Sequence, residues 1–246
     1  MTSEQFSFRS QEEKKAYVRQ MFSGIAKRYD FLNHFLSFGL DRRWRKRAIG
    51  IVGEHLRAQG ITTPAILDIA SGTGDLALEA LRQLPAAKVT AIDPVNEMLD
   101  IFREKIAGKQ AEIIIEQGDA EQMRFPNGSF HAVTIGFGTR NFTNLQTAFT
   151  EIHRVLSPGG IFVNLELSSP RRFPMKQLYT FYSKFIVPLI GKTVSKHGEA
   201  YAYLPDSIRR FPEREAIVGM LRSAGFAEAK WKDLTAGIVT MHIAVK

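Results

Sequence analysis

The chain has 246 residues, of which 44% are hydrophobic and 24% charged, and this length and composition suit one large globular α/β domain. It contains no cysteine, which excludes disulfides, thiolate metal sites and cysteine nucleophiles. The net charge of +8 is concentrated in the first 50 residues, around the basic run at residues 42–47, and such a surface attracts nucleic acid, anionic lipid or acidic ligands without choosing among them.

The beginning of the chain shows no targeting segment. It lacks the apolar core of a signal peptide, and Glu4, Glu12 and Glu13 are acids that a transit peptide would avoid. No window reaches the roughly 18 apolar residues needed to cross a bilayer. We therefore expect a soluble protein of the cytoplasm.

Residues 11–58 have a helical pattern, with breaks predicted near Ser23-Gly24 and at residues 37–39. From residue 64 onward, short apolar strands alternate with helices of about 10 to 15 residues. We predict strands at 65–70, 88–92, 113–115, 132–135 and 161–165, and helices at 75–84, 95–107 and 145–156, the last one stopped by a turn at residues 157–160. This alternation is typical of a parallel, doubly wound sheet.

After residue 170 this alternation of strands and helices ends. A helical insertion rich in aromatic residues is predicted at about 171–210, and a helix at 213–224 follows it. Two strands, 226–234 and 238–245, are joined by a tight turn and must therefore pair antiparallel. The predicted fold is a Rossmann-like α/β doubly wound sheet, mostly parallel, with a C-terminal antiparallel strand pair. We divide the chain into an N-terminal helical segment, residues 1–60, that covers the substrate side, and a catalytic domain, residues 61–246, that carries the insertion.

The predicted cofactor site follows the first strand. Gly72 and Gly74 let the backbone turn tightly and approach a ligand, and the next helix presents its unpaired N–H groups at the same place. Asp93 ends the second strand about 20 residues later, where a carboxylate typically holds the ribose of a nucleotide. We therefore assign Asp68, Gly72, Gly74 and Asp93 to cofactor binding.

Three interpretations of this turn compete: a bare turn, a dinucleotide site and an S-adenosylmethionine site. A dinucleotide site normally has three glycines, and Ala77 takes the third place here. Later segments favour S-adenosylmethionine. Asp119 follows the third strand as an acceptor for the amine of adenine, Gly136 lies at the open edge of the cleft, and dehydrogenases usually lack the closing strand pair. The fold class is then that of the class I methyltransferases.

The sequence also resembles one family closely, the ubiquinone/menaquinone biosynthesis C-methyltransferases. The resemblance is carried by motifs at 18–30, 32–33, 36–40, 44–45, 136–141, 201–208 and 234–239, which span nearly the whole chain. It implies cofactor contacts at Thr73, Asp93, Asp119 and Ala120. Some relatives have serine in place of Gly136, so a side-chain contact from that position is absent here. The resemblance also implies a polyprenylated quinol substrate, and the family as a whole favours demethylmenaquinol.

Carbon methylation needs a nucleophilic carbon, which a quinol supplies once a ring hydroxyl loses its proton. Orientation, proton removal and exclusion of water are then the tasks of the protein. Arg140 and Asn141, at the mouth of the site, are the first candidates to polarise the substrate oxygens, against the alternative of a loop cap and a surface cation. Tyr29 and His34, with Asp30 beside them, are expected to close over the substrate, although Tyr29 is equally suited to helix packing.

The same ambiguity holds for Tyr201 and Tyr203, which we assign to the substrate. The general base is left open among His34, Asp119 and a water bound to Arg140. No metal is expected, because the six histidines form no convincing ligand cluster. The aromatic stretch at 173–190 is interpreted either as an apolar channel for the polyprenyl tail or as an ordinary buried helix.

The basic run at 42–47, with Trp44, is expected to rest on anionic headgroups. We therefore predict transient contact with the inner face of the cell membrane, no nucleic-acid partner, and a homodimer by default. Two other functions stay open. One is a methyltransferase that acts on RNA or on a soluble phenol, and the other is a cofactor-binding subunit without catalysis in a quinone-biosynthesis assembly.

Overall fold

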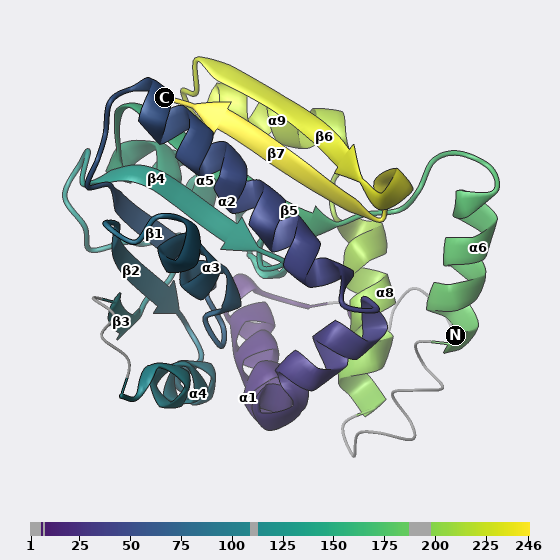
Figure 1. Cartoon of the computed structure of the whole chain (residues 1–246). Coiled ribbons are helices and arrows are strands. Elements are labelled where there is room, and N and C mark those ends of the chain that lie inside the picture. The colour runs from purple at the N-terminus through teal and green to yellow at the C-terminus, as the bar shows by residue number, and fades with distance from the viewer. Residues whose placement is uncertain (1–5, 7, 109–112, 187–197) are drawn as a thin grey trace.

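In the computed structural model, which describes residues 6, 8–108, 113–186 and 198–246, seven strands form one sheet in the order β3-β2-β1-β4-β5-β7-β6 (Figure 1). The pairs among the first five strands of this order are parallel, and the pairs β5·β7 and β6·β7 are antiparallel. The predicted fold class is thereby confirmed. The strands are β1 (Ala65–Ile69), β2 (Lys88–Asp93), β3 (Ile113–Gln117), β4 (Phe130–Gly136), β5 (Leu156–Leu167), β6 (Glu228–Leu234) and β7 (Val239–Val245).

Helices cover both faces of the sheet, as Figure 1 shows. Residues of α2 (Leu40–Ala58), α3 (Asp75–Gln83) and α4 (Asn96–Ile106) join one hydrophobic cluster, and residues of α5 (Leu145–Val155) and α9 (Arg214–Ser223) join another on the opposite face. Strand order reverses direction between β1 and β4, so the carboxyl ends of these two strands border a crevice. In open α/β sheets this reversal is where ligands bind.

Helix α1 (Gln11–Leu36) lies across the end of the sheet where the parallel strands finish, beside α8 (Gly198–Arg210) (Figure 1). The predicted break at Ser23-Gly24 is wrong, because α1 runs through it without interruption. A glycine costs a helix about 1 kcal/mol. Packing of Ala26 against α4 and of Leu32 against α8 fixes the helix on the far side of Gly24 and outweighs that cost. The predicted break at 37–39 is confirmed.

Two further predictions about local structure need correction. Helix α2 buries Trp44 and Arg45, because the helical period places them with Ala48 on its inner face. Trp44 Nε1 donates to Thr235 Oγ1 at 2.8 Å, so this side chain does not face headgroups as predicted. The predicted turn at 157–160 lies inside β5, as a bulge between its pairings of Leu156 with Phe130 and Ile161 with Ala132.

The insertion after β5 is helical in its described parts, with α6 (Met175–Phe181), a π-helix (Tyr182–Ile186) and α8. The end of the aromatic stretch, residues 187–190, lies outside the described residues. Within the described part of the chain, no helix is both long enough and apolar enough to span a bilayer.

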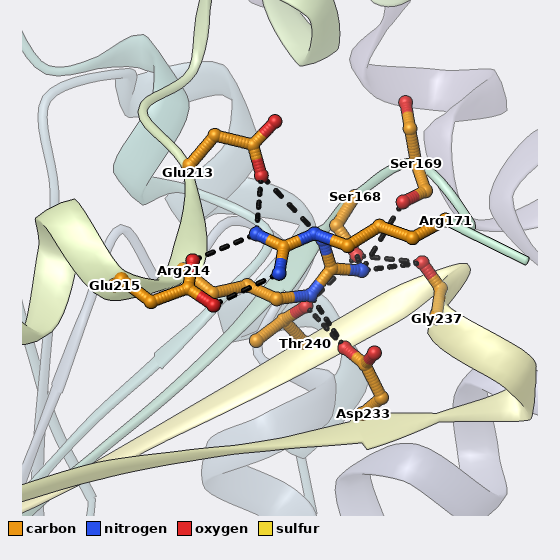
Figure 2. Close-up of polar contacts among 9 residues, drawn as sticks. All are labelled: Ser168, Ser169, Arg171, Glu213, Arg214, Glu215, Asp233, Gly237 and Thr240. Carbon is orange, nitrogen blue, oxygen red and sulfur yellow. Dashed lines mark hydrogen bonds and ion pairs between the residues drawn. The ribbon is translucent and has the colours of Figure 1, made fainter.

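Two arginines, Arg171 and Arg214, hold the start of the insertion on the rest of the fold (Figure 2). Arg171 binds Glu213 and Glu215 at the beginning of α9, each at 2.7 Å. Arg214, which is buried, donates to Asp233 Oδ1 at 2.7 Å and to the carbonyl oxygen of Gly237 at 3.2 Å. The segment that leaves β5 is therefore fixed to α9 and to the β6–β7 hairpin.

Candidate functional site

The turn after β1 is shaped by its glycines. Gly72 and Gly74 have φ of +55° and +86°, the left-handed region that favours glycine. A Cβ on Gly74 would lie 2.2 Å from the ring of Phe102, which is fully buried in α4. Gly74 is therefore required twice, for its backbone conformation and for the close approach of α4 to the start of α3.

Asp93 locks the same turn to the end of β2. Its Oδ2 accepts from the Gly72 N–H at 2.8 Å, and its Oδ1 accepts from the Val95 N–H at 2.9 Å. Burial raises the pKa of Asp93 to about 6, against the two backbone hydrogen bonds, which lower it. The carboxylate is thus ionised at neutral pH, and each oxygen keeps a lone pair for a further donor.

Asp119 stands after β3 at the other end of the cleft. Its Oδ2 lies 2.7 Å from Nζ of Lys15 on α1, and its Oδ1 accepts from the Glu121 N–H at 2.9 Å. Lys15 also reaches Glu121 Oε2 at 3.1 Å. No local pattern predicts this contact, since Lys15 lies more than 100 residues from its partner.

A cavity of about 800 Å³, open solvent at its mouth included, lies between these carboxylates. Of the predicted cofactor residues, five line it: Gly72, Asp93, Asp119, Ala120 and Gly136. The structure thereby brings together residues from the ends of four strands in one cavity.

The remaining predicted cofactor residues lie in or under the turn. Asp68 is buried, accepts from Thr134 Oγ1 at 2.7 Å, and has its pKa raised by burial to about 7. Thr73 is also buried, and its hydroxyl donates to Asp30 on α1. As far as the described residues define the cavity, Asp68, Thr73 and Gly74 support its floor without lining it.

A second cavity of about 790 Å³ adjoins the first. Its wall combines residues of α1, α2, β5, α6 and α8, and it is mainly apolar, with Arg140 and Asp41 among its charged members. Burial raises the pKa of Tyr179, another wall residue, to about 12, although the charge of Arg140 opposes this, so its phenol stays neutral. Sequence reasoning assigned no role to Asn33, Asp41 and Tyr179; Asn33 lies in the motif at 32–33, whereas no motif covers Asp41 or Tyr179.

Tyr29 and Phe137 line both cavities and therefore stand at their junction. Phe137 has φ of +64°, a strained conformation for an aromatic residue, of the kind that concentrates at functional sites. Its ring is held edge-on by Trp44, at a centroid distance of 6.1 Å, and by the guanidinium of Arg45 at 5.7 Å.

Arg140 follows β4 in the short helix Thr139–Asn141, and its side chain is only 6% exposed. Its guanidinium lies 2.8 Å from Glu166 Oε1 and also donates to the carbonyl oxygen of Phe137. Burial lowers the pKa of Arg140, but the charge of Glu166, its hydrogen bond and the nearby tyrosines together raise it overall, so Arg140 stays a cation. Its Nε is buried without a hydrogen-bond partner among the described residues, which leaves one donor for a ligand.

Asn141 lines the first cavity, and its buried Oδ1 likewise has no hydrogen-bond partner within the described residues. An orphaned buried acceptor beside a cavity is a site for a ligand donor, such as an ammonium group. Together with the carboxylates of Asp93 and Asp119, it gives this cavity acceptors suited to the amines and ribose hydroxyls of S-adenosylmethionine.

His34 is not among the residues that line these two cavities, as far as the described residues define them. Its Nδ1 lies 2.6 Å from Asp41 Oδ2, so it stands behind an aspartate that does line the second cavity. His34, Asp41 and Asp75 bring potential metal ligands within 4.8 Å of one another. Arg45 and Lys105 already bind these carboxylates, as in an ion-pair network.

The two predicted substrate tyrosines lie in α8. The side chain of Tyr201 is outside the described part of the structure. The ring of Tyr203 packs edge-on against Phe6, at a centroid distance of 5.5 Å, and is tilted against Tyr17 at 5.7 Å, which makes it part of the contact between α8 and the N-terminal residues. Tyr203 also lines a smaller cavity next to Arg140.

Comparison with known proteins agrees with this architecture. A family model described as the ubiE/COQ5 methyltransferase family matches residues 9–246. The chain is 40% identical over 236 residues to a demethylmenaquinone methyltransferase of Bacteroides fragilis, with 95% of this chain and 94% of that protein covered. It is 42% identical over 237 residues to the ubiquinone/menaquinone biosynthesis C-methyltransferase UbiE of Geobacter sp. (strain M21), with 95% and 98% covered.

Solved structures share the fold at low identity. The cyclase SpnF matches with a TM-score of 0.62 and 18% identity, over 93% of this chain and 95% of that one. A SAM-dependent methyltransferase from Aquifex aeolicus matches with a TM-score of 0.54 and 14% identity, over 74% and 82%.

Proposed function

The chain belongs to the ubiE/COQ5 methyltransferase family and is an S-adenosylmethionine-dependent C-methyltransferase, and from this premise we propose that it methylates a ring carbon of a polyprenylated quinol, with demethylmenaquinol as the acceptor. The observation that supports this acceptor most directly is the second cavity. It is apolar, it adjoins the cofactor cavity, and a buried cation with a free donor stands in its wall.

The first cavity holds the cofactor, which supplies a methyl group on a sulfonium sulfur. Asp93 accepts from the ribose hydroxyls and Asp119 from the adenine amine, while Asn141 offers its Oδ1 to the ammonium group. Tyr29 and Phe137 separate the two cavities and hold the acceptor ring at the boundary. Such positioning, with water excluded, is a large part of what an enzyme contributes to a transfer reaction.

Arg140 stabilises the negative charge of the acceptor once its hydroxyl is ionised. Because Arg140 stays protonated, it acts as an electrostatic partner and does not take up the proton. Its pairing with Glu166, which also accepts from the Arg140 and Leu167 N–H groups at 2.9 and 2.8 Å, fixes the guanidinium in one orientation. Preorganisation of this kind is what makes such a charge effective.

Replacing a ring hydrogen by a methyl group releases one proton from the acceptor in each turnover. We assign its removal to Asp41, which lines the second cavity, with His34 behind it at 2.6 Å as the group that carries the proton onward. His34 therefore takes part in the reaction by passing the proton on from Asp41. Asp119 is less suited to the task, because it lines the cofactor cavity and not the acceptor cavity.

The protein works in the cytoplasm, at the inner face of the cell membrane where a polyprenyl tail resides. Phe38 at the end of α1 packs on Tyr182 of the π-helix at 6.2 Å, and Tyr182 donates to the carbonyl oxygen of Leu36, which joins the two segments at the second cavity. Exposed basic residues of α2, the helix that follows Phe38 in the chain, complement anionic lipid. Phenylalanines between 52% and 81% exposed gather on these segments: Phe31, Phe35, Phe38, Phe173, Phe181 and Phe185.

The acceptor is tested with methyl-labelled S-adenosylmethionine and a panel of compounds: demethylmenaquinol, its oxidised quinone, catechol and RNA. We expect label in the quinol alone, because the oxidised quinone has no hydroxyl to ionise. Label in RNA or catechol at a comparable rate would refute the proposal. Cofactor binding without transfer to any acceptor would indicate a binding subunit instead.

Membrane contact is tested separately, by co-sedimentation with vesicles that contain anionic lipid at low salt. Wild type should pellet, and the double variant Phe38→Ser, Phe181→Ser should stay in the supernatant. The variant Lys88→Ser, at an exposed position at the start of β2, serves as the control. Equal recovery of all three proteins in the supernatant would exclude this surface.

A further inference from the structure

Helix α1 contacts the cofactor site at two separate places. Near its beginning, Lys15 binds Asp119 at 2.7 Å and Glu121 at 3.1 Å. Near its end, Asp30 accepts a hydrogen bond from the hydroxyl of Thr73 in the turn after β1. The stretch of α-helix between Lys15 and Asp30 spans about 22 Å, at about 1.5 Å per residue. The two contacts therefore hold the helix at opposite ends of the cleft.

One face of α1 closes the cofactor cavity between these contacts. Lys15, Val18, Phe22 and Tyr29 all line it, and their spacings of three, four and seven residues put them on the same side of the helix. A ligand in this cavity is thus enclosed by strand ends on one side and by α1 on the other. The cavity is also open to solvent at its mouth, so movement of α1 away from the strand ends would widen the path for entry and release.

We propose that α1 is a lid that closes over bound S-adenosylmethionine, and that Lys15 is a cofactor-positioning residue that fixes the Asp119 carboxylate at the adenine end and fastens the lid there. This rests on the family's cofactor and is independent of which acceptor the enzyme uses.

The lone pairs of Asp119 allow it to bind Lys15 and the cofactor together. An ionised carboxylate offers about four acceptor positions. The ammonium of Lys15 takes one on Oδ2, and the Glu121 N–H takes one on Oδ1 at 2.9 Å. One position on each oxygen is left for the exocyclic amine of adenine. Lys15 therefore orients this carboxylate without competing with the cofactor for it.

The other end of the lid is tied into a wider network. The second oxygen of Asp30 lies 2.6 Å from Lys105 of α4, and Lys105 lies 2.8 Å from Asp75 at the start of α3. Because Tyr29 precedes Asp30 and lines both cavities, closing the lid over the cofactor also completes the acceptor cavity. The cofactor should then bind before the acceptor, and the spent cofactor should leave last.

The test measures release of S-adenosylhomocysteine, the demethylated cofactor, which needs no acceptor. Lys15→Met should increase its dissociation rate about tenfold in stopped-flow displacement, and should abolish the slowing of amide exchange in α1 that the ligand causes in wild type. Lys15→Arg should keep at least half of the effect of lysine, since it retains the charge. Lys27→Met is the matched control, an exposed lysine of the same helix away from this cavity.

Unchanged circular dichroism and melting temperature establish that a variant is folded. A dissociation rate for Lys15→Met within twofold of that for Lys27→Met would overturn the proposal. Tighter binding in Lys15→Met would overturn it as well, because Lys15 would then be a competitor of adenine. Failure of methyl transfer to a quinol would leave this result standing, so the two proposals fail separately.

Discussion

The two cavities are built in different ways, although they share Tyr29 and Phe137. Apart from the face of α1 that covers it, the cofactor cavity is formed by strand ends, backbone N–H groups and short turns, so most of its shape follows from the sheet. The acceptor cavity is formed by side chains of helices far apart in the sequence. The backbone of the sheet therefore shapes the cofactor cavity for one ligand. The shape of the acceptor cavity, in contrast, can be altered by substituting individual side chains.

The largest effect is expected on the acceptor side, from Arg140→Met. Loss of a buried charge that stabilises an anion typically costs about 10²- to 10³-fold in kcat, and affinity for S-adenosylhomocysteine should change less than threefold. Steady-state kinetics and calorimetry measure the two quantities. The double variant Arg140→Met, Glu166→Gln removes the uncompensated carboxylate and controls for folding. A parallel loss of cofactor affinity would show that the cavities are not separable.

Gly74→Ala is the substitution that should disrupt the cofactor cavity most strongly. The added Cβ would overlap the Phe102 ring, and the alanine would have to adopt a left-handed φ. Together these two effects destabilise the folded state by about 2–5 kcal/mol. At about 2–4 °C per kcal/mol, we expect thermal unfolding roughly 5–15 °C lower, with loss of cofactor binding.

Gly60→Ala is the matched control for this strain. Gly60 has φ of +71°, and a Cβ there would meet nothing within 4 Å, so only the backbone cost of about 1 kcal/mol applies. Equal melting temperatures for the two variants would contradict the overlap with Phe102 as the cause.

A smaller effect on the acceptor side is expected from His34→Gln. Glutamine still donates to Asp41 but cannot take a proton, so kcat should fall about tenfold, within the range for general acid–base groups, with KM for the quinol unchanged. His55→Gln, whose histidine contacts the carbonyl oxygen of Gly159 at 2.8 Å, is the control. A wild-type rate for His34→Gln would remove His34 from the reaction.

The last effect concerns pH and the floor of the cofactor cavity, where no catalytic group is changed. Because the pKa of Asp68 is raised to about 7 from its ordinary 3.8, the folded state keeps a proton that the unfolded state has lost. The stability that comes from this bound proton is fully present below about pH 4. It is lost as the pH rises to about 7, and the free energy of unfolding falls by at most about 1.4 kcal/mol per pH unit in that window.

Asp68→Asn lacks this titration, so its stability relative to wild type should rise across that window and level off above it. Urea unfolding of the ligand-free proteins at several pH values measures the difference. A difference that is constant with pH would show that the pKa of Asp68 is the same in the folded and unfolded states, which would contradict the raised pKa.

The cofactor cavity could largely be predicted from the sequence, whereas the acceptor cavity could not. The strands, the glycine turn, Asp93 and Asp119 follow local patterns, because a parallel sheet places successive strand ends together. The unbroken α1, the burial of Trp44 and the Lys15–Asp119 pair depend on tertiary packing that no local spacing records. Asn33, Asp41 and Tyr179 come together in the acceptor cavity only once α1, α2 and α6 are folded around it.

The central claim is that the acceptor is a quinol methylated on a ring carbon. It is tested most directly by incubating the wild-type enzyme with demethylmenaquinol and S-adenosylmethionine that carries a ¹³C-methyl group, followed by NMR of the product. We predict one labelled methyl group on the ring carbon, with one equivalent of S-adenosylhomocysteine formed. A labelled methyl ether on a quinol oxygen, or no labelled quinol, would contradict the account.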